Sequence, residues 1–222
     1  MNPLIFSRRA FLAATPFALA GCATQRLEPP PETLARSVII PPHLAALYDE
    51  LPDERYPIPA VDFEEVDPEV LRRVVEFPTS EMPGTVIVDT RERALFLVME
   101  GGRAMRYGVG VGKEGMAWAG RAVVGRKGEW PRWTPTKEMI AREPERNGPW
   151  AGGMEPGLSN PLGARALYLY RNGRDSFYRI HGTNEPWSIG KSVSSGCIRM
   201  INQDVIDLYS RVPVGAPVIV KL

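Results

Sequence analysis

Five short runs of β-branched and aromatic residues, separated by turn-forming residues, restrict this chain to a fold built mainly from strands. The runs are TVIVDT (85–90), ALFLVM (94–99), ARALYLY (164–170), SFYRIHG (176–182) and APVIVKL (216–222). Asn172-Gly173, between the third and fourth runs, is a hairpin signal. INQDVIDLYSRV (201–212) predicts a short helix with Asn202 as its cap. Frequent Gly (21) and Pro (22) argue against a helical bundle, so we expect a mainly β (β-rich α+β) domain over residues 84–222.

A long stretch between the strand patterns, residues 113–162, is rich in Gly, Pro and Trp and lacks clean periodicity. A connection of this length in a compact domain is usually functional or disordered. Trp130, Trp133 and Trp150 favour order, because disordered segments contain few aromatic residues. The tryptophans are expected either to wall a substrate site or to pin the loop to the domain.

Residues 41–83 form an N-terminal arm in which we expect two short helices. The second has Asp67 as a cap, Pro68 at the first helical position and apolar residues at helical spacing in 70–75. His43 lies in the first, and nothing around it has metal-ligand spacing, so we interpret it as structural or exposed.

The first 22 residues have the features of a bacterial export signal. The pair Arg8-Arg9 precedes an apolar run too short to span a bilayer, and SRRAFL resembles a twin-arginine motif. LAGC, ending at Cys22, resembles a lipoprotein lipobox, which predicts a lipid anchor on Cys22; the alternative is an ordinary cleaved signal. Residues 23–40 are polar and proline-rich, as in a flexible tether. We therefore expect an exported, periplasmic protein held at a membrane.

The chain has 27 Lys and Arg against 26 Asp and Glu. This near-neutral balance gives no positive potential that would attract nucleic acid. Neither a metal-ligand cluster nor a phosphate-binding loop is evident, so we expect no metal and no cofactor.

Cys197 and His181 are a candidate catalytic pair. If Cys22 carries lipid, Cys197 of an exported chain stays a thiol, because no other cysteine remains to form a disulfide. The glycine-containing segment between them is able to fold back and bring the two side chains together. An adjacent imidazole either takes the thiol proton or, as imidazolium, stabilises the thiolate.

Residues around the pair support acyl-transfer chemistry. Gly196 permits close approach of the backbone to a carbonyl, and the N–H groups of Gly196 and Cys197 suit an oxyanion hole. In an extended run Arg199 projects to the same side as Cys197, where it adds positive potential or binds a substrate carboxylate. The alternative is that Cys197 is simply buried and His181 simply hydrogen-bonded, as both residue types often are.

HGTNEPWSIGKSVSSGCIRM (181–200) resembles the active-site motif of the bacterial L,D-transpeptidase (YkuD-type) catalytic domain: His-Gly-Thr, a spacer, then Ser-x-Gly-Cys-Ile/Val-Arg-Met/Leu. The likeness extends over residues 84–222. It departs at WTPTKEM, where Lys137 occupies the place of a glycine common in the family, within a longer insertion. The resemblance implies a β-sandwich or mixed sheet with a few short helices and the Trp/Pro/Gly-rich loop over the site.

What the resemblance implies for function is a peptidoglycan L,D-transpeptidase that needs no cofactor. Cys197 would attack the third-residue carbonyl of a stem tetrapeptide, release D-alanine and pass the acyl group to an amine, giving a 3–3 cross-link. His181 would act as base and then acid. The expected oxyanion and substrate-binding residues are Gly196, Ser195, Arg199, Gly182 and Thr183.

Three alternatives remain open from the sequence. Water as the acceptor would make the chain an L,D-carboxypeptidase or cysteine hydrolase of wall peptides. A protein lysine as the acceptor would make it a transferase that attaches a lipoprotein to peptidoglycan. A lipoprotein that only binds the wall is disfavoured, because binding needs no thiol beside a histidine.

Overall fold

The structure is a computed structural model that describes residues 40–112, 118–194 and 196–222, all within one compact unit of residues 38–222. The arm of residues 41–83 is therefore part of the same unit as the strand-rich region that follows it. The expected export signal (1–22), with Cys22, and residues 23–39 of the expected tether lie outside the described residues, as does Ser195.

The strands are β1 (Arg73–Glu76), β2 (Val86–Asp89), β3 (Ala94–Met99), β4 (Arg103–Gly108), β5 (Val111–Gly112), β6 (Gly120–Glu129), β7 (Arg165–Arg171), β8 (Arg174–His181), β9 (Ser192–Ser194), β10 (Ile198–Arg199) and β11 (Pro217–Lys221). The helices are α1 (Pro42–Ala45), α2 (Lys137–Arg142), α3 (Pro144–Asn147) and α4 (Asn202–Arg211), with 3₁₀ turns at Ala46–Tyr48, Pro68–Val70, Gly148–Trp150 and Pro186–Ser188. No helix in the described part of the chain has the length and apolar character needed to cross a bilayer.

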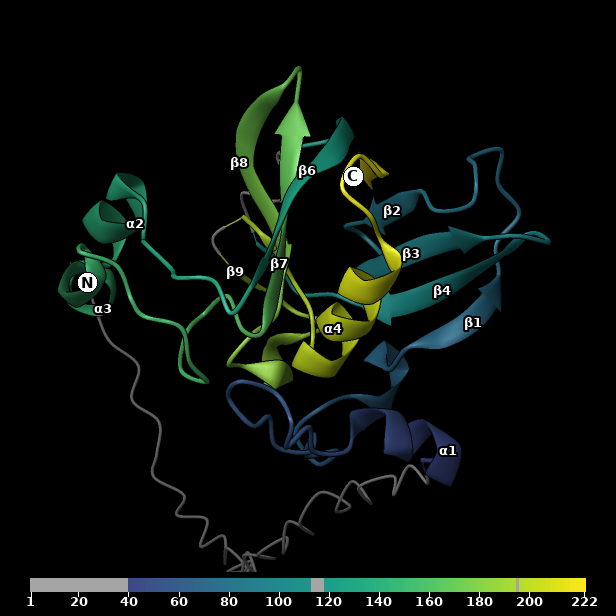
Figure 1. Cartoon of the computed structure of the whole chain (residues 1–222), viewed down its shortest axis with the longest axis horizontal. Coiled ribbons are helices and arrows are strands. Elements are labelled where there is room, and N and C mark those ends of the chain that lie inside the picture. Colours follow the sequence, from purple (N-terminus) through teal and green to yellow (C-terminus); the bar gives the residue numbers. More distant parts are fainter. Residues whose placement is uncertain (1–39, 113–117, 195) are drawn as a thin grey trace, which may run out of the picture. The chain divides into compact units, whose positions relative to one another are not determined.

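Nine of these strands form one mixed sheet in the order β1-β4-β3-β2-β11-β6-β7-β8-β10 (Figure 1). The pairs β2–β11 and β8–β10 are parallel, and the other neighbours are antiparallel. β5 and β9 form a separate parallel pair. The expected mainly β fold with a mixed sheet and few short helices is confirmed, and the Asn172-Gly173 turn joins β7 to β8 as expected.

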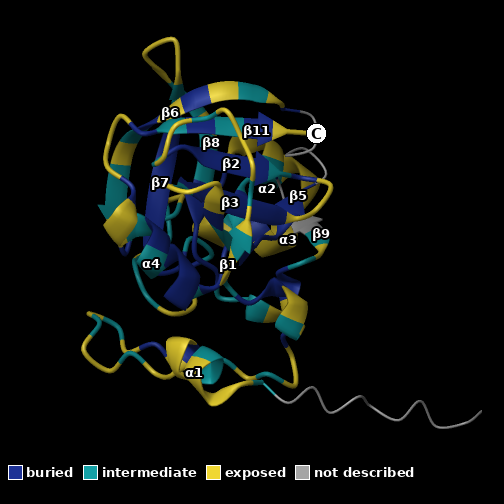
Figure 2. Ribbon diagram, turned by 90° about the vertical axis from the view of Figure 1, so that its right-hand side faces the viewer, coloured by how far each residue is buried: buried dark blue, intermediate teal, exposed yellow. Residues whose placement is uncertain are grey.

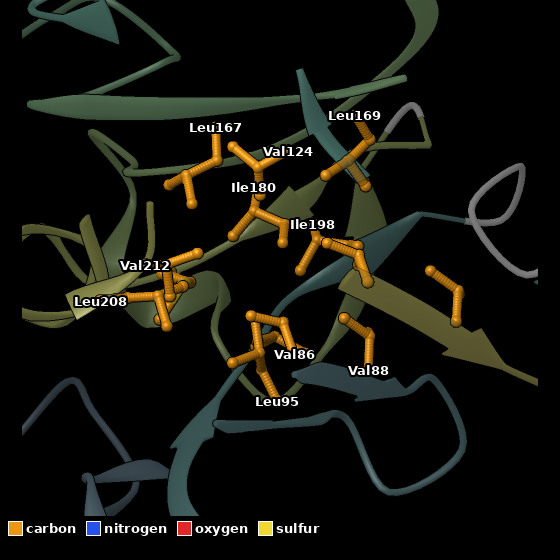
Figure 3. Packing of buried hydrophobic residues seen from close by; sticks show 14 of the residues in the cluster. Val86, Val88, Leu95, Val124, Leu167, Leu169, Ile180, Ile198, Leu208 and Val212 are labelled. Carbon is orange, nitrogen blue, oxygen red and sulfur yellow. The ribbon is translucent and has the colours of Figure 1, made fainter. Parts of the chain in front are cut away.

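The main core lies between the sheet and α4. Side chains of the sheet, such as Val86 and Leu167, point toward one another and toward Leu208 of α4 (Figure 3). Burying an aliphatic side chain of this size contributes about 1.5–3 kcal/mol. Ile87, between two residues of this core, packs on the opposite face with Phe96. The central strands are thus apolar on both faces, as their continuous hydrophobic sequence requires.

The arm is less helical than expected, and the second predicted helix is wrong. Asp67 does cap a turn, accepting a hydrogen bond of 2.9 Å from the N–H of Glu69, but that turn ends at Val70. Val74 and Val75 then belong to β1 and pair with β4. β-branched residues lose side-chain freedom in a helix, and the edge of a sheet offers them backbone partners instead. Figure 2 shows α1 with exposed and intermediate residues, consistent with its having no buried residue.

Two further details differ from the sequence-based expectation. β6 runs through the stretch that lacked periodicity. The sequence does not reveal this strand because its three glycines and outward cations obscure the inward Ala122 and Val124. Asn202 is the first residue of α4 rather than its cap. Its side chain instead accepts from the N–H of Ala164 at 3.0 Å and donates to the carbonyl of Thr183 at 3.0 Å.

Candidate active site

Cys197 and His181 come from neighbouring parallel strands at one end of the sheet. In the pairing of β10 with β8, Ile198 lies opposite Ile180, and Arg199 lies opposite His181. Both isoleucines belong to the buried core. Because side chains alternate along a strand, Cys197, Arg199 and His181 face away from that core. The alternation expected from the sequence is confirmed, and all three residues line one cleft.

His181 is oriented by a carbonyl group at the end of its own strand. The side chain is 4% exposed, and its Nδ1 lies 2.6 Å from the carbonyl oxygen of Gly182. A neutral imidazole has one N–H, so this contact assigns the hydrogen to Nδ1 and leaves the lone pair on Nε2. The Gly182 contact thus favours one tautomer and, with a second backbone hydrogen bond to Pro161, orients the ring.

The environment keeps both members of the pair neutral. Burial lowers the pKa of His181 to about 4, and the positive charge of Arg199 acts in the same direction, while the Gly182 carbonyl opposes them. Burial also raises the pKa of the Cys197 thiol, against a backbone hydrogen bond from Arg179 and the charges of Arg179 and Arg199. With both groups of the cleft neutral, the structure does not favour a preformed thiolate–imidazolium pair.

The cleft measures about 460 Å³, and its far wall comes from the insertion. We call residues 133–154 the cap. Backbone hydrogen bonds between Trp133 and Met154, 3.0 and 2.6 Å long, close its base, and it carries α2 and α3 (Figure 1). Trp133, Met139 and Asn147 of the cap line the cleft with Cys197. The two roles considered for the tryptophans divide between residues: Trp133 walls the cleft, whereas Trp130 is buried and donates to Glu54 of the arm at 2.9 Å.

Glu185 joins the cap to the strands of the site. One carboxylate oxygen lies 2.9 Å from the Arg199 guanidinium, and the other lies 3.3 Å from Arg146 of α3. The Arg199 and Glu185 side chains are 13% and 27% exposed, so this pair is partly shielded from water. A charge pair of this kind is stronger than a fully exposed one. The three residues link α3 to the floor of the cleft.

Gly182 and Thr183 lie behind His181. A Cβ on Gly182 would collide with the side-chain oxygen of Asn202. Thr183 is 2% exposed, and its hydroxyl accepts a hydrogen bond of 3.0 Å from the N–H of Glu185. This packing holds the segment that orients both His181 and Glu185.

Gly196 lines the cleft next to Cys197 and has φ +121°, a conformation that favours glycine. Of the expected site residues, the structure thus brings Cys197, His181, Gly196 and Arg199 into one cleft, with Gly182 and Thr183 in support. Sequence reasoning did not identify Glu185, Arg146 or Phe177. The contacts of Glu185 join segments far apart in sequence, and no local pattern signals them.

A thiol, a histidine and a glycine backbone that line one cleft are groups that acyl transfer uses. The family model described as "L,D-transpeptidase catalytic domain" matches residues 83–220, more than half of the chain. The "Probable L,D-transpeptidase YbiS" of Escherichia coli (strain K12) is 34% identical over 138 residues, 60% of this chain and 43% of that protein. The "Putative L,D-transpeptidase YkuD" of Bacillus subtilis (strain 168) is 47% identical over 88 residues, 40% of this chain and 45% of that protein.

A solved structure from Brucella melitensis, named "Probable carnitine operon oxidoreductase caia", is 48% identical with a TM-score of 0.50, covering 70% of this chain and 96% of that one. Its name denotes an oxidoreductase, whereas the family model and the two curated relatives denote L,D-transpeptidases. The chain spans less than half the length of those two relatives. Through residues 83–220, which contain the whole β8–β10 site, the chain belongs to the L,D-transpeptidase catalytic domain family.

Proposed function

We propose that this chain is a peptidoglycan L,D-transpeptidase with Cys197 as nucleophile and His181 as general base and acid. The observation that carries the proposal is the placement of both side chains on one face of the β8–β10 pair, in a cleft with the Nδ1 of His181 held by Gly182. The proposed donor is a stem tetrapeptide, and the bond attacked joins its third residue to the terminal D-alanine.

In the acylation step, Nε2 of His181 takes the thiol proton as the Cys197 sulfur attacks the carbonyl carbon of the third residue. The backbone N–H groups of Gly196 and Cys197 are proposed to hold the oxyanion that develops. The C–N bond then breaks, and His181 returns the proton to the departing D-alanine nitrogen. The products are a thioester on Cys197 and free D-alanine.

In the second step, an amine of a neighbouring stem attacks the thioester. His181 takes a proton from that amine and delivers it to the sulfur, which restores the thiol and leaves a 3–3 amide cross-link. The cap supports an amine acceptor over water, because Trp133 and Met139 place apolar surface along the cleft and reduce hydration of the thioester.

Arg199 is assigned an electrostatic and positioning role. Its guanidinium is paired with Glu185, and its charge acts on His181 directly opposite. Binding of a substrate carboxylate, the other role expected for it, would have to displace Glu185. Export to the periplasm and a lipid anchor on Cys22 remain proposals from the sequence; a Cys22→Ala chain should no longer partition with membranes, and unchanged partitioning would contradict the anchor.

The decisive experiment incubates the purified full chain with disaccharide-tetrapeptide and resolves the products by mass. Cross-linked dimers with release of D-alanine support transpeptidation. Tripeptide alone would identify a carboxypeptidase, and no release of D-alanine would overturn both enzymatic assignments. Cys197→Ser serves as the inactive variant, and Ser210→Ala, an exposed change on α4 away from the cleft, serves as its matched control.

A further inference from the structure

Phe177 has a backbone and a side chain that ordinary strand packing does not explain. It lies within β8 but has φ +64°, and its side chain is 76% exposed. Left-handed backbone costs a residue with a side chain about 1–2 kcal/mol. Because the phenylalanine is exposed, its burial contributes little to offset that cost. Residues with strained backbone dihedrals concentrate at functional sites.

Neighbouring side chains build this conformation. Asp175 accepts a hydrogen bond of 2.8 Å from the N–H of Phe177. Ser176 donates to the carbonyl of Leu169 at 2.5 Å and accepts from the N–H of Tyr178 at 3.2 Å. The β7–β8 register shifts at this place, between Tyr168 and Tyr170 of β7. Residues 175–178 are therefore a β-bulge with its own side-chain supports, which we call the Phe177 bulge.

The bulge points two groups of Phe177 at the site. Its carbonyl oxygen accepts a hydrogen bond from the Cys197 sulfur at 3.8 Å. Its side chain lines the same cleft as Cys197. The Arg179 guanidinium, held by two hydrogen bonds of 2.7 and 3.0 Å to Asp175, lies 5.8 Å from the centre of the Phe177 ring. Three residues of β8, 176–178, stand against the single Leu169 of β7, so this segment leaves the regular ladder and its carbonyl groups are not committed to β7.

We propose that Phe177 is a positioning residue of the acyl-transfer site: its carbonyl orients the Cys197 thiol, and its ring forms the wall on which the donor stem peptide packs. The identity of the donor rests on the proposed function above, whereas the role of the carbonyl does not. A thiol that donates to the Phe177 carbonyl is stabilised in its protonated form. The methyl groups and peptide planes of a stem are suitable surfaces for contact with the exposed ring.

The two roles are separable by substitution. Phe177→Gly removes the ring but keeps the carbonyl, and glycine adopts φ +64° without strain. Ser176→Ala keeps the ring but removes two hydrogen bonds that support the bulge, so the carbonyl loses its fixed position. Phe177→Trp restores an aromatic wall. All variants are made in a Cys22→Ala full chain, in which Cys197 is the remaining cysteine, and thermal melting shows whether each one folds.

Alkylation of Cys197 by iodoacetamide is measured over pH, without and with disaccharide-tetrapeptide as a protecting ligand. For Phe177→Gly we expect an unchanged alkylation profile but a half-protecting tetrapeptide concentration about tenfold higher, with recovery in Phe177→Trp. For Ser176→Ala we expect faster alkylation at neutral pH and an inflection at lower pH, and protection weakens as well because the ring belongs to the same bulge.

Protection by the same tetrapeptide concentration in wild type and Phe177→Gly, or no protection of wild type, would overturn the role of the ring. A folded Ser176→Ala variant with the wild-type alkylation profile would overturn the role of the carbonyl. If Ser176→Ala fails to fold, Asp175→Ala decides instead, because it removes the hydrogen bond to the N–H of Phe177 that supports the bulge and keeps the ring. Alkylation and protection need no turnover, so failure of the proposed enzymatic activity is seen separately, as missing D-alanine release.

Discussion

Arg199 lies directly opposite His181 in the parallel pairing of β10 with β8, so a permanent cation faces the imidazole proposed as the base. Its charge is the second cause, after burial, of the low pKa of His181. Arg199→Gln should therefore raise that pKa and move the acid limb of D-alanine release to higher pH. Arg146→Gln is the matched control, because Arg146 shares Glu185 but is not among the charges that lower the pKa of His181. An equal shift in both variants would contradict a direct effect across the strands.

The alkylation rate of wild-type Cys197 should depend on pH as a buried neutral thiol does. Burial raises its pKa, so we expect an inflection above the ordinary thiol value of about 8.5. Below the inflection the rate should fall about tenfold per pH unit, since the thiolate is the nucleophile. A plateau between pH 5 and 7 would instead indicate a preformed thiolate–imidazolium pair. Stopped-flow or mass-resolved alkylation in the Cys22→Ala chain provides the measurement.

Asp204 should make the protein less stable as pH rises. Its carboxyl accepts a hydrogen bond of 2.9 Å from Tyr48, and burial raises its pKa to about 7. The folded state thus binds more protons than the unfolded state between about pH 4 and 7. The stability contributed is fully present below pH 4 and is lost as pH rises through 7, with a slope of at most about 1.4 kcal/mol per unit.

Urea unfolding of wild type and Asp204→Asn at several pH values tests this prediction. Taking the difference between their free energies of unfolding cancels the contribution of His181, which depends on pH in the opposite direction. That dependence follows from a folded pKa of about 4, below the unfolded value, so His181 contributes stability at neutral pH that is lost on acidification. Asp207→Asn is the control, because the pKa of Asp207 is lowered and its contribution has the reverse sign. A constant difference between wild type and Asp204→Asn from pH 4 to 8 would refute the prediction.

Glu185→Gln should loosen the cap while leaving the rest of the domain folded. The change weakens the contacts to both Arg146 and Arg199, so we expect faster hydrogen exchange in α2 and α3 and about threefold weaker protection by tetrapeptide. Glu155→Gln breaks the exposed pair with Arg132 near the base of the cap and is the matched control. Similar exchange in the two variants would show that Glu185 does not hold the cap.

The strands and the pair at the site were predictable because both depend on local pattern. Period-two alternation predicts Arg199 on the same side as Cys197, and both line the cleft. β6 was not predictable, since its three glycines and outward cations obscure the alternation; Gly125 is required there because the Tyr170 ring occupies the space of a Cβ. β1 was mistaken for helix because Val70, Leu71, Val74 and Val75 also fit helical spacing.

The cap and the Phe177 bulge could not be predicted for a different reason. Thr136 caps α2 by accepting a hydrogen bond of 3.2 Å from the N–H of Met139. The position of the cap over the cleft depends on Glu185, 39 residues from Arg146. The bulge depends on a register shift between two strands, which one strand's sequence does not define.

β10 has two residues, and Ile198, with Met200 just beyond it, anchors this strand in the core. A slip of one position would turn the thiol inward and present an aliphatic side chain to the substrate. The buried side of this short strand therefore sets the register and so decides which of several successive residues faces the cleft. Ile198→Ser changes a buried residue that contacts no ligand, and we expect it to abolish the proposed activity although Cys197 and His181 are unchanged.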